Sequence, residues 1–220
     1  GADVIKITAT GGVLSVAKNG QNPQFTANEL AAIVSTAKDY GMLTAAHAHG
    51  DEGMRRAIIA GIKTIEHGTL MEPSTMDLMV KYDAYLVPTI SAGKAAAANA
   101  AIPGYFPEVI AKKALEIGPR SQSTFAAAYK KGVKIAFGTD AGVSPHGDNA
   151  KEFGFMVAAG MPVMEAIAAA TITNANLLGY SDSLGQLKQG YTADIVAVNE
   201  HPQANVSTLE QVVFVMKEGL

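Results

Sequence analysis

Short apolar runs alternate with longer segments of helical periodicity along most of this 220-residue chain. Five runs predict β-strands, at residues 4–8, 43–47, 62–66, 84–88 and 133–137. The segments between and after them predict helices at 26–40, 51–60, 73–81, 107–131, 149–159 and 162–170. Thr26 and Glu29 have the spacing of a capping box at the start of the first helix. Strands that alternate with helices are typical of βαβ units with a parallel sheet, so the pattern predicts the α/β class.

Five predicted strands leave two architectures open. A closed (β/α)8 barrel needs eight strands, so the chain holds either a doubly wound sheet or strands 4–8 of a TIM-type barrel. Residues 91–104, which include Gly93, Pro103 and Gly104, predict a long loop or lid. The pattern becomes turn-rich near residues 180–183, with two further strands at 195–198 and 212–216. We therefore expect a barrel portion at 1–180 and a small, separate β layer at 181–220.

Composition excludes several classes of function. Lys and Arg number 17 against 20 Asp and Glu, a net charge of −3 without a basic block, so we expect no nucleic-acid partner. No apolar stretch approaches the ~20 residues that a membrane span requires. The chain has no Cys, which excludes disulfides and thiolate chemistry. No signal peptide is predicted at the first residues, and the compartment stays open between cytoplasm, periplasm and exterior.

Four of the five histidines lie where a predicted strand meets the loop that follows it. His47 and His49 end the second strand, His67 ends the third, and His146 follows the fifth. In α/β barrels the site is built at these carboxyl ends of the strands, so the four side chains are expected on one face. Neutral imidazole is a good ligand for a divalent transition metal. A single histidine there is more often a hydrogen-bonded structural residue, but four together favour a metal site.

Asp140 and Lys6 belong to the same predicted face. Asp140 follows the fifth strand, where a carboxylate can bind a metal or accept a proton from water; a helix cap is the alternative. Lys6 alternates with Ile5 and Ile7, so its side chain points into the barrel if those two face the helices. A buried lysine has a lowered pKa, and its neutral amine can form a carbamate with CO2. A snorkelling or salt-bridged lysine is the alternative.

Gly11 and Gly12 follow the strand of Lys6. Their backbone N–H groups can bind a substrate carboxylate or an oxyanion, although a plain turn is the alternative. The sequence contains no Walker-type phosphate loop, no Gly-x-Gly-x-x-Gly fingerprint and no Gly-x-Ser-x-Gly elbow.

The motifs in combination resemble the amidohydrolase superfamily, and in particular its branch of Xaa-Pro dipeptidase-like and imidazolonepropionase-like hydrolases. The resemblance covers nearly the whole chain. It is carried by Gly-Ala-Asp-Val-Ile-Lys-Ile, Ala-Thr-Gly-Gly-Val, Ala-His-Ala-His-Gly, Ile-Glu-His-Gly-Thr, Gly-Thr-Asp-Ala-Gly, Pro-His-Gly-Asp-Asn and Leu-Gly-Gln-Leu-Lys-Gln-Gly-Tyr-Thr-Ala-Asp-Ile-Val. It implies a (β/α)8 barrel with metals at its carboxyl face and a C-terminal portion of a small β-sandwich.

The resemblance also implies the roles of individual residues. Lys6 would be the carboxylated lysine that bridges two zinc ions, His47 and His67 would bind one of these ions, and Asp140 would be ligand and proton shuttle. His49 and His146 would contact substrate, and His146, Gly11 or Gly12 would help to stabilise the oxyanion. The implied reaction is hydrolysis of a small amide or peptide bond, of the dipeptidase or carboxypeptidase type, by hydroxide that the two metals activate.

One departure from the family pattern is the strand-1 His-x-His pair, which the chain lacks. We expect it upstream of residue 1, so the isolated chain is expected to lack one metal site. Alternatives within enzymes are a cyclic-amide hydrolase and a phosphotriesterase or lactonase; an alternative outside them is an inactive structural module. A small-molecule or dipeptide substrate and a homo-oligomer are the expected partners.

Overall fold

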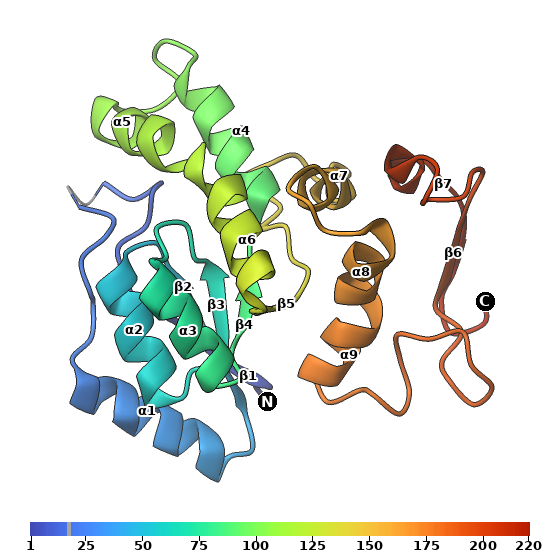
Figure 1. Ribbon diagram of the computed structural model, residues 1–220, viewed down its shortest axis with the longest axis horizontal. Coiled ribbons are helices and arrows are strands. Elements are labelled where there is room, and N and C mark those ends of the chain that lie inside the picture. The colour runs from blue at the N-terminus through green and yellow to red at the C-terminus, as the bar shows by residue number, and fades with distance from the viewer. Residues whose placement is uncertain (17–18) are drawn as a thin grey trace.

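The computed structural model describes residues 1–16 and 19–220. Within them, one sheet consists of five parallel strands in the order β1-β2-β3-β4-β5 (Figure 1). These strands are β1 (Val4–Thr8), β2 (Leu43–Ala48), β3 (Thr64–His67), β4 (Tyr85–Val87) and β5 (Lys134–Ile135). Neighbours in the sheet are neighbours in sequence, which is the order of a barrel wall and not of a doubly wound sheet. The α/β prediction is confirmed, and the sheet is open at β1 and β5.

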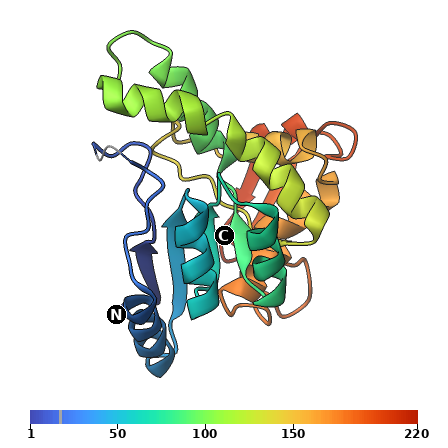
Figure 2. The same cartoon turned by 60° about the vertical axis from the view of Figure 1, so that its left-hand side comes forward.

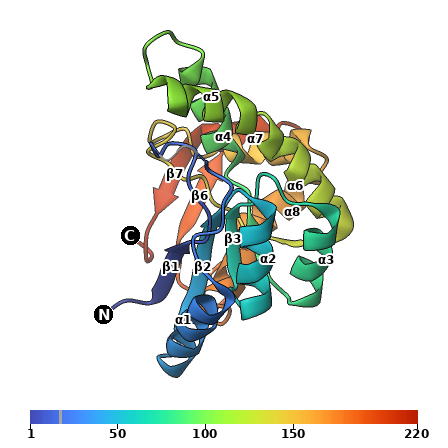
Figure 3. The same ribbon diagram turned by 90° about the vertical axis from the view of Figure 1, so that its left-hand side faces the viewer.

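Helices follow the strands and cover one face of the sheet (Figures 1 and 3). α1 begins with the predicted capping box, because Oγ1 of Thr26 accepts from the backbone N–H of Glu29, whose carboxylate accepts from that of Thr26. The helices that follow the strands outside residues 90–117 include α1 (Ala27–Asp39), α2 (Asp51–Ala60), α3 (Pro73–Lys81), α6 (Arg120–Lys131), α7 (Lys151–Ala158) and α8 (Val163–Ala168).

The main hydrophobic core lies between the sheet and these helices. Ala46, Ile65 and Leu86 of the strands pack against Ile58 and Phe125 of the helices. The opposite face of the sheet carries a smaller cluster of Tyr85, Val87 and Ala136. This second face is the interior side of the barrel wall, and the polar residues of the site line its upper end.

The segment predicted as a loop at 91–104 is mostly helical, which corrects that expectation. α4 (Ile90–Ala100) and α5 (Glu108–Ile117) form a pair above the carboxyl ends of the strands (Figure 2). Gly93, taken as a loop signal, lies in the packed interface, since a Cβ there would be 2.8 Å from Oγ of Ser121. The predicted stretch 107–131 is likewise two helices, separated at Gly118 and Pro119, because proline interrupts the helical hydrogen bonds.

The C-terminal part forms its own antiparallel pair of strands, apart from the five-stranded sheet (Figure 1). It follows the π-helical turn η1 (Ala169–Thr173) and α9 (Asn174–Leu177), and consists of β6 (Ile195–Val198), the 3-10 turn η2 (Val206–Glu210) and β7 (Val212–Met216). Both predicted strands are therefore present. The domain limits of 1–180 and 181–220 stay a prediction. None of the helices in the described ranges has the length and apolarity for a membrane crossing.

Candidate active site

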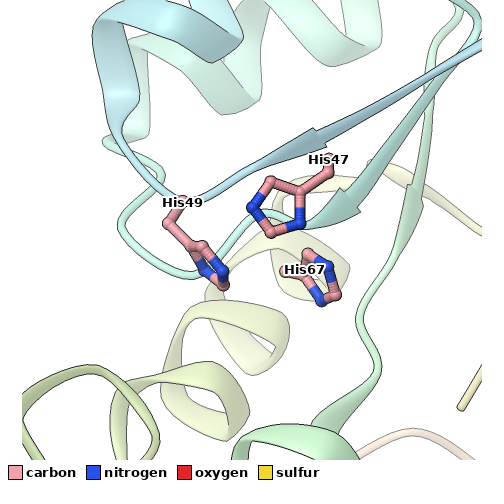
Figure 4. Close-up of side chains that lie close together, drawn as sticks. All are labelled: His47, His49 and His67. Atoms are coloured by element: carbon pink, nitrogen blue, oxygen red, sulfur yellow. The ribbon is translucent and has the colours of Figure 1, made fainter. Parts of the chain in front are cut away.

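Three imidazoles meet at the carboxyl end of the sheet. His47 lies near the end of β2, His49 directly after it, and His67 at the end of β3. Their ring centroids are 4.6 to 4.9 Å apart. One nitrogen of each ring lies within 4.8 Å of the others, and the three rings surround a shared space (Figure 4).

A backbone feature turns His67 toward its partners. Glu66 is in register with His47, so regular alternation would turn His67 to the helical face. His67 instead has a φ of 71°, a left-handed conformation that ends the alternation and is uncommon for a non-glycine residue. As a result the side chains of Glu66 and His67 both lie on the interior side of the sheet, where Lys6 and Asp140 act on the Glu66 carboxylate.

Hydrogen bonds orient each ring. Nε2 of His47 lies 3.4 Å from the carbonyl oxygen of Gly11, which can only accept, so Nε2 carries the proton and Nδ1 keeps its lone pair. Nδ1 of His67 lies 2.7 Å from Oγ1 of Thr89, and Nδ1 of His49 lies 3.0 Å from Oγ1 of Thr69. These contacts leave Nδ1 of His47 and Nε2 of His67 and His49 as the nitrogens for a ligand.

Burial keeps the three rings neutral. It lowers the pKa of His47, lowers that of His67 strongly, and lowers that of His49 to about 3. Mutual repulsion between the imidazoles lowers the pKa of His49 and His67 further. Neutral imidazole is the form that binds metal. Neutral nitrogens gathered at one point fit a divalent transition metal. The expected ligand set takes two of the three, those of His47 and His67, and leaves His49 for substrate.

Lys6 and Asp140 line the same cavity as the three imidazoles. Lys6 projects from β1 on the face of His47, as the alternation predicted. Its side chain is exposed, because β1 is an edge of the sheet in the part of the chain that the structure describes. The burial of its amine stays a prediction. Asp140 follows β5 in a left-handed conformation with a φ of 52°. All four residues of the expected ligand set thus meet at one cavity, while their ligand roles stay predictions.

Of the remaining predicted residues, Gly12 lies at the cavity, whereas Gly11 and His146 are outside the described part of its lining. Gly11 points its N–H to the carbonyl oxygen of Asn22 at 3.4 Å, which disfavours it as an oxyanion donor. His146 is exposed in the loop after β5 and is outside the set of described residues that line the cavity. Its contact with substrate stays a prediction.

The cavity has a volume of about 380 Å³ and two different walls. One wall carries the polar residues described above. The other is apolar and is formed by the loop after β1, by α4, by the end of α5 and by the loop after β5, with side chains of Val13, Leu14, Ala92, Ala96, Ile117 and Val143. Lys113 of α5 holds this wall together, because its Nζ donates to the carbonyl oxygens of Gly12 and Ser15 at 3.0 and 2.6 Å.

Several supporting residues were missed by the sequence analysis. Thr69 and Thr89 hydrogen-bond the imidazoles. Glu66 is a half-buried carboxylate on the same strand as His67, and desolvation raises its pKa. Glu152 of α7 is fully buried below the start of α4. Thr69 lies two residues after His67, and this proximity is the one signal that marks it in the sequence. No sequence signal marks Thr89 or Glu152, because neither lies near a histidine of the site in the sequence.

A parallel sheet in sequential strand order, with imidazoles at its carboxyl end, has the architecture of a TIM-barrel wall whose site fits a metal ion. The amidohydrolase family matches residues 1–220, and the chain belongs to that family. The resemblance drawn from the motifs is confirmed.

Individual relatives support this assignment. Ochratoxinase of Aspergillus niger is 35% identical over 213 residues, which are 96% of this chain and 44% of the ochratoxinase. A crystal structure of a Xaa-Pro dipeptidase with bound methionine in the active site matches with a TM-score of 0.98 and 57% identity, over 100% of this chain and 54% of that chain. A prolidase complexed with N-methylphosphonate-L-proline matches with a TM-score of 0.92 and 29% identity, over 100% and 54%. The chain thus spans about half the length of these relatives.

Proposed function

We propose that the protein is a metal-dependent hydrolase of small amide bonds, of the Xaa-Pro dipeptidase type. The observation that carries this proposal is the convergence of His47, His67, Lys6 and Asp140 on one cavity that also has an apolar wall. The similarity to a Xaa-Pro dipeptidase and to a prolidase supports the dipeptide as substrate. The similarity to ochratoxinase supports a range of substrates that extends beyond dipeptides.

We assign metal binding to the imidazoles of His47 and His67, the carboxylate of Asp140, and Lys6 as its carbamate. Zinc suits this donor set. When bound, such a metal lowers the pKa of water and polarises a carbonyl group. His49 packs against both other rings and would contact substrate from its free Nε2. The strand-1 His-x-His pair and the second metal stay predictions.

Asp140 performs the proton transfers in this proposal. Its carboxylate accepts a proton from the attacking water, whose oxygen bonds to the carbonyl carbon of the substrate. The same carboxyl group then gives the proton to the nitrogen of the leaving amine as the carbon–nitrogen bond breaks. The products are one carboxylic acid and one amine, and Asp140 regains its charge.

The apolar wall defines the substrate side of the proposal. Ala92 and Ala96 of α4 are both buried and leave room for an apolar side chain next to the imidazoles. Apolar walls with a few convergent polar groups are typical of small-molecule sites. We therefore expect dipeptides or N-acyl amino acids with apolar side chains to be better substrates than charged ones.

The experiment compares Asp140→Asn with the parent protein at its natural length, loaded with Zn²⁺. Xaa-Pro dipeptides, N-acyl amino acids, a cyclic amide, a lactone and a phosphotriester serve as substrates. We expect turnover of dipeptides or N-acyl amino acids by the parent, and a loss of about 10²-fold to 10⁴-fold in kcat with Asp140→Asn at similar zinc content. Asp182→Asn, which alters an exposed carboxylate of the tail, is the matched control.

Other outcomes separate the alternatives. Preference for the cyclic amide, the lactone or the phosphotriester would replace the dipeptidase assignment, and an Asp140→Asn enzyme with full activity would remove the proton-transfer role. Purified protein that binds no zinc and turns over no substrate would favour a structural module. The expected homo-oligomer stays a prediction, which light scattering of the purified protein decides.

A further inference from the structure

Glu152 is a fully buried carboxylate of the first turn of α7. It lies outside the metal ligands and outside the residues that line the cavity. Its two oxygens accept from three donors, the N–H of Ile90 at 2.8 Å, the N–H of Ser91 at 2.7 Å and Oγ of Ser91 at 2.6 Å. α7 packs against α4 at this point (Figure 1). Complete burial of a carboxylate costs free energy unless hydrogen bonds compensate for the lost water. The three donors provide this compensation, and their position shows what the carboxylate does for the fold.

The donors lie at the start of α4. The residue before that helix is Thr89, whose own side chain makes no capping hydrogen bond. The Glu152 carboxylate takes over this role from another helix, because it binds the two N–H groups that open α4. Thr89 is held in a left-handed conformation, with φ and ψ of 47°, which a β-branched residue rarely adopts. In this conformation its Oγ1 lies 2.7 Å from Nδ1 of His67.

The same turn of α7 also reaches the loop of Asp140. Asn149 lies just before α7, and its side-chain amide donates to Oγ1 of Thr139 at 3.0 Å. The N–H of Glu152 donates to the carbonyl oxygen of Asn149. One turn therefore contacts the residue before Asp140 and the helix start that orients His67. The strand ends that carry His67 and Asp140 are far apart in the sequence, and this turn of α7 contacts the surroundings of both.

We propose that Glu152 is a positioning residue of the metal centre, which acts on His67 through the start of α4 and Thr89. The inference rests on the proposed function in that His67 is taken as a ligand. The carboxylate fixes the backbone at Thr89, the hydroxyl of Thr89 fixes the ring of His67, and Nε2 of that ring is held toward the cavity. Partners of this kind, one step beyond the ligands, set metal affinity.

Glu152→Gln is the first variant of the test. The amide keeps the size of the side chain but replaces one accepting oxygen with a donating NH2 group, so the N–H of Ile90 or of Ser91 loses its acceptor. Thr89→Val is the second variant, because it keeps the β-branched shape and removes the hydroxyl that contacts His67. Glu165→Gln is the matched control, since Glu165 accepts a hydrogen bond from Tyr129 on the outer side of α8.

Two readouts are recorded on the folded chain. In the metal-free protein, the ¹⁵N chemical shifts of the His67 ring report the hydrogen bond at Nδ1. Calorimetric titration with Zn²⁺ then gives the metal affinity. We expect Glu152→Gln to shift the His67 signals and to weaken zinc binding by about 10-fold to 100-fold, with Glu165→Gln unchanged in both. In the double variant the loss should equal that of the larger single variant, because both act along one path.

The outcomes are separable from those of the proposed function. Unchanged His67 signals in Glu152→Gln, or losses of zinc affinity that simply add in the double variant, would overturn the positioning role. If the parent chain binds no zinc, the proposed function fails, while the ring shifts of the metal-free protein still decide the role of Glu152. If Glu152→Gln does not fold, Ser91→Ala, which removes one of the three donors, must shift the same His67 signals in a folded protein, and their constancy would count against the proposal.

Discussion

At the scale of single residues, three imidazoles within 4.8 Å of one another can coexist only because they are neutral. Protonation of one ring would place a cation in a buried site and raise the cost of protonating the next. Burial is the main reason that their pKa values are lowered. The site is therefore prepared for a metal at neutral pH without the release of protons from its histidines.

The same shifts predict how stability depends on pH. The pKa of His49 is about 3 in the folded chain, against an ordinary value of 6.5. Above pH 6.5 this ring is largely neutral in both the folded and the unfolded chain. As the pH falls below 6.5, the ring binds a proton in the unfolded chain but stays neutral in the folded chain until the pH nears 3. The metal-free protein should therefore lose stability as the pH falls from 6.5 toward 3, by up to about 1.4 kcal/mol per pH unit for each such ring.

Urea unfolding of the metal-free protein at a series of pH values measures this dependence. His49→Gln should reduce the slope of the free energy of unfolding against pH by an amount close to the uptake of one proton. His201→Gln, at an exposed position of the tail, should leave the slope unchanged. Burial raises the pKa of Glu66 and Glu152, and these carboxyl groups act in the opposite direction. The difference between variants isolates His49, and equal slopes in all three proteins would contradict the lowered pKa.

At the scale of elements, close helix packing explains where sequence patterns misled. The Ala-rich run of α4 has high helix propensity, yet Gly93 and the later Pro103 and Gly104 suggested a loop. Gly93 is needed for another reason, since a Cβ there would lie 2.8 Å from Oγ of Ser121 and 3.3 Å from the carbonyl oxygen of Gly118. Glycines that permit contact and glycines that permit turns look alike in a single sequence.

Gly53 of α2 illustrates the same constraint and can be tested. A Cβ there would lie 2.3 Å from Cγ2 of Thr10 and 2.9 Å from the carbonyl oxygen of Ala9. Thr10 is buried, and its Oγ1 accepts from the N–H of His49. Gly53→Ala should therefore lower the free energy of unfolding by about 1–3 kcal/mol, because overpacking exceeds the gain in helix propensity.

Gly154→Ala in α7 is the matched control for this prediction. A Cβ at Gly154 would meet nothing within 4 Å, so only helix propensity changes, and the free energy of unfolding should rise by about 0.5–1 kcal/mol. Denaturant unfolding of both variants gives the two signs. A stabilised Gly53→Ala protein would show that α2 can move away from β1 at little cost.

At the scale of the whole molecule, the sequence predicted which residues meet but not how each is presented. Positions at strand ends brought His47, His67 and Asp140 together, because the carboxyl ends of parallel strands share one edge. The orientation of His67 depends on a φ of 71° that no periodicity indicates. The strand order in the sheet, which places Lys6 on the face of His47, likewise needs the fold, because a strand's own sequence does not show which strands pair with it. Supports such as Glu152 come from distant helices and need the fold to be seen.

A metal should stabilise the whole fold, because its proposed ligands come from β1, β2, β3 and the loop after β5. A ligand that binds only the folded state adds about 2.7 kcal/mol at 100 times its Kd. Zn²⁺ should therefore raise the Tm of the metal-free chain, and a chelator should reverse the shift. His47→Ala combined with His67→Ala should remove most of the rise, whereas His146→Ala, at an exposed position, should keep it. An equal rise in the double variant would place the stabilising ion elsewhere in the chain and leave the shared cavity without its proposed metal.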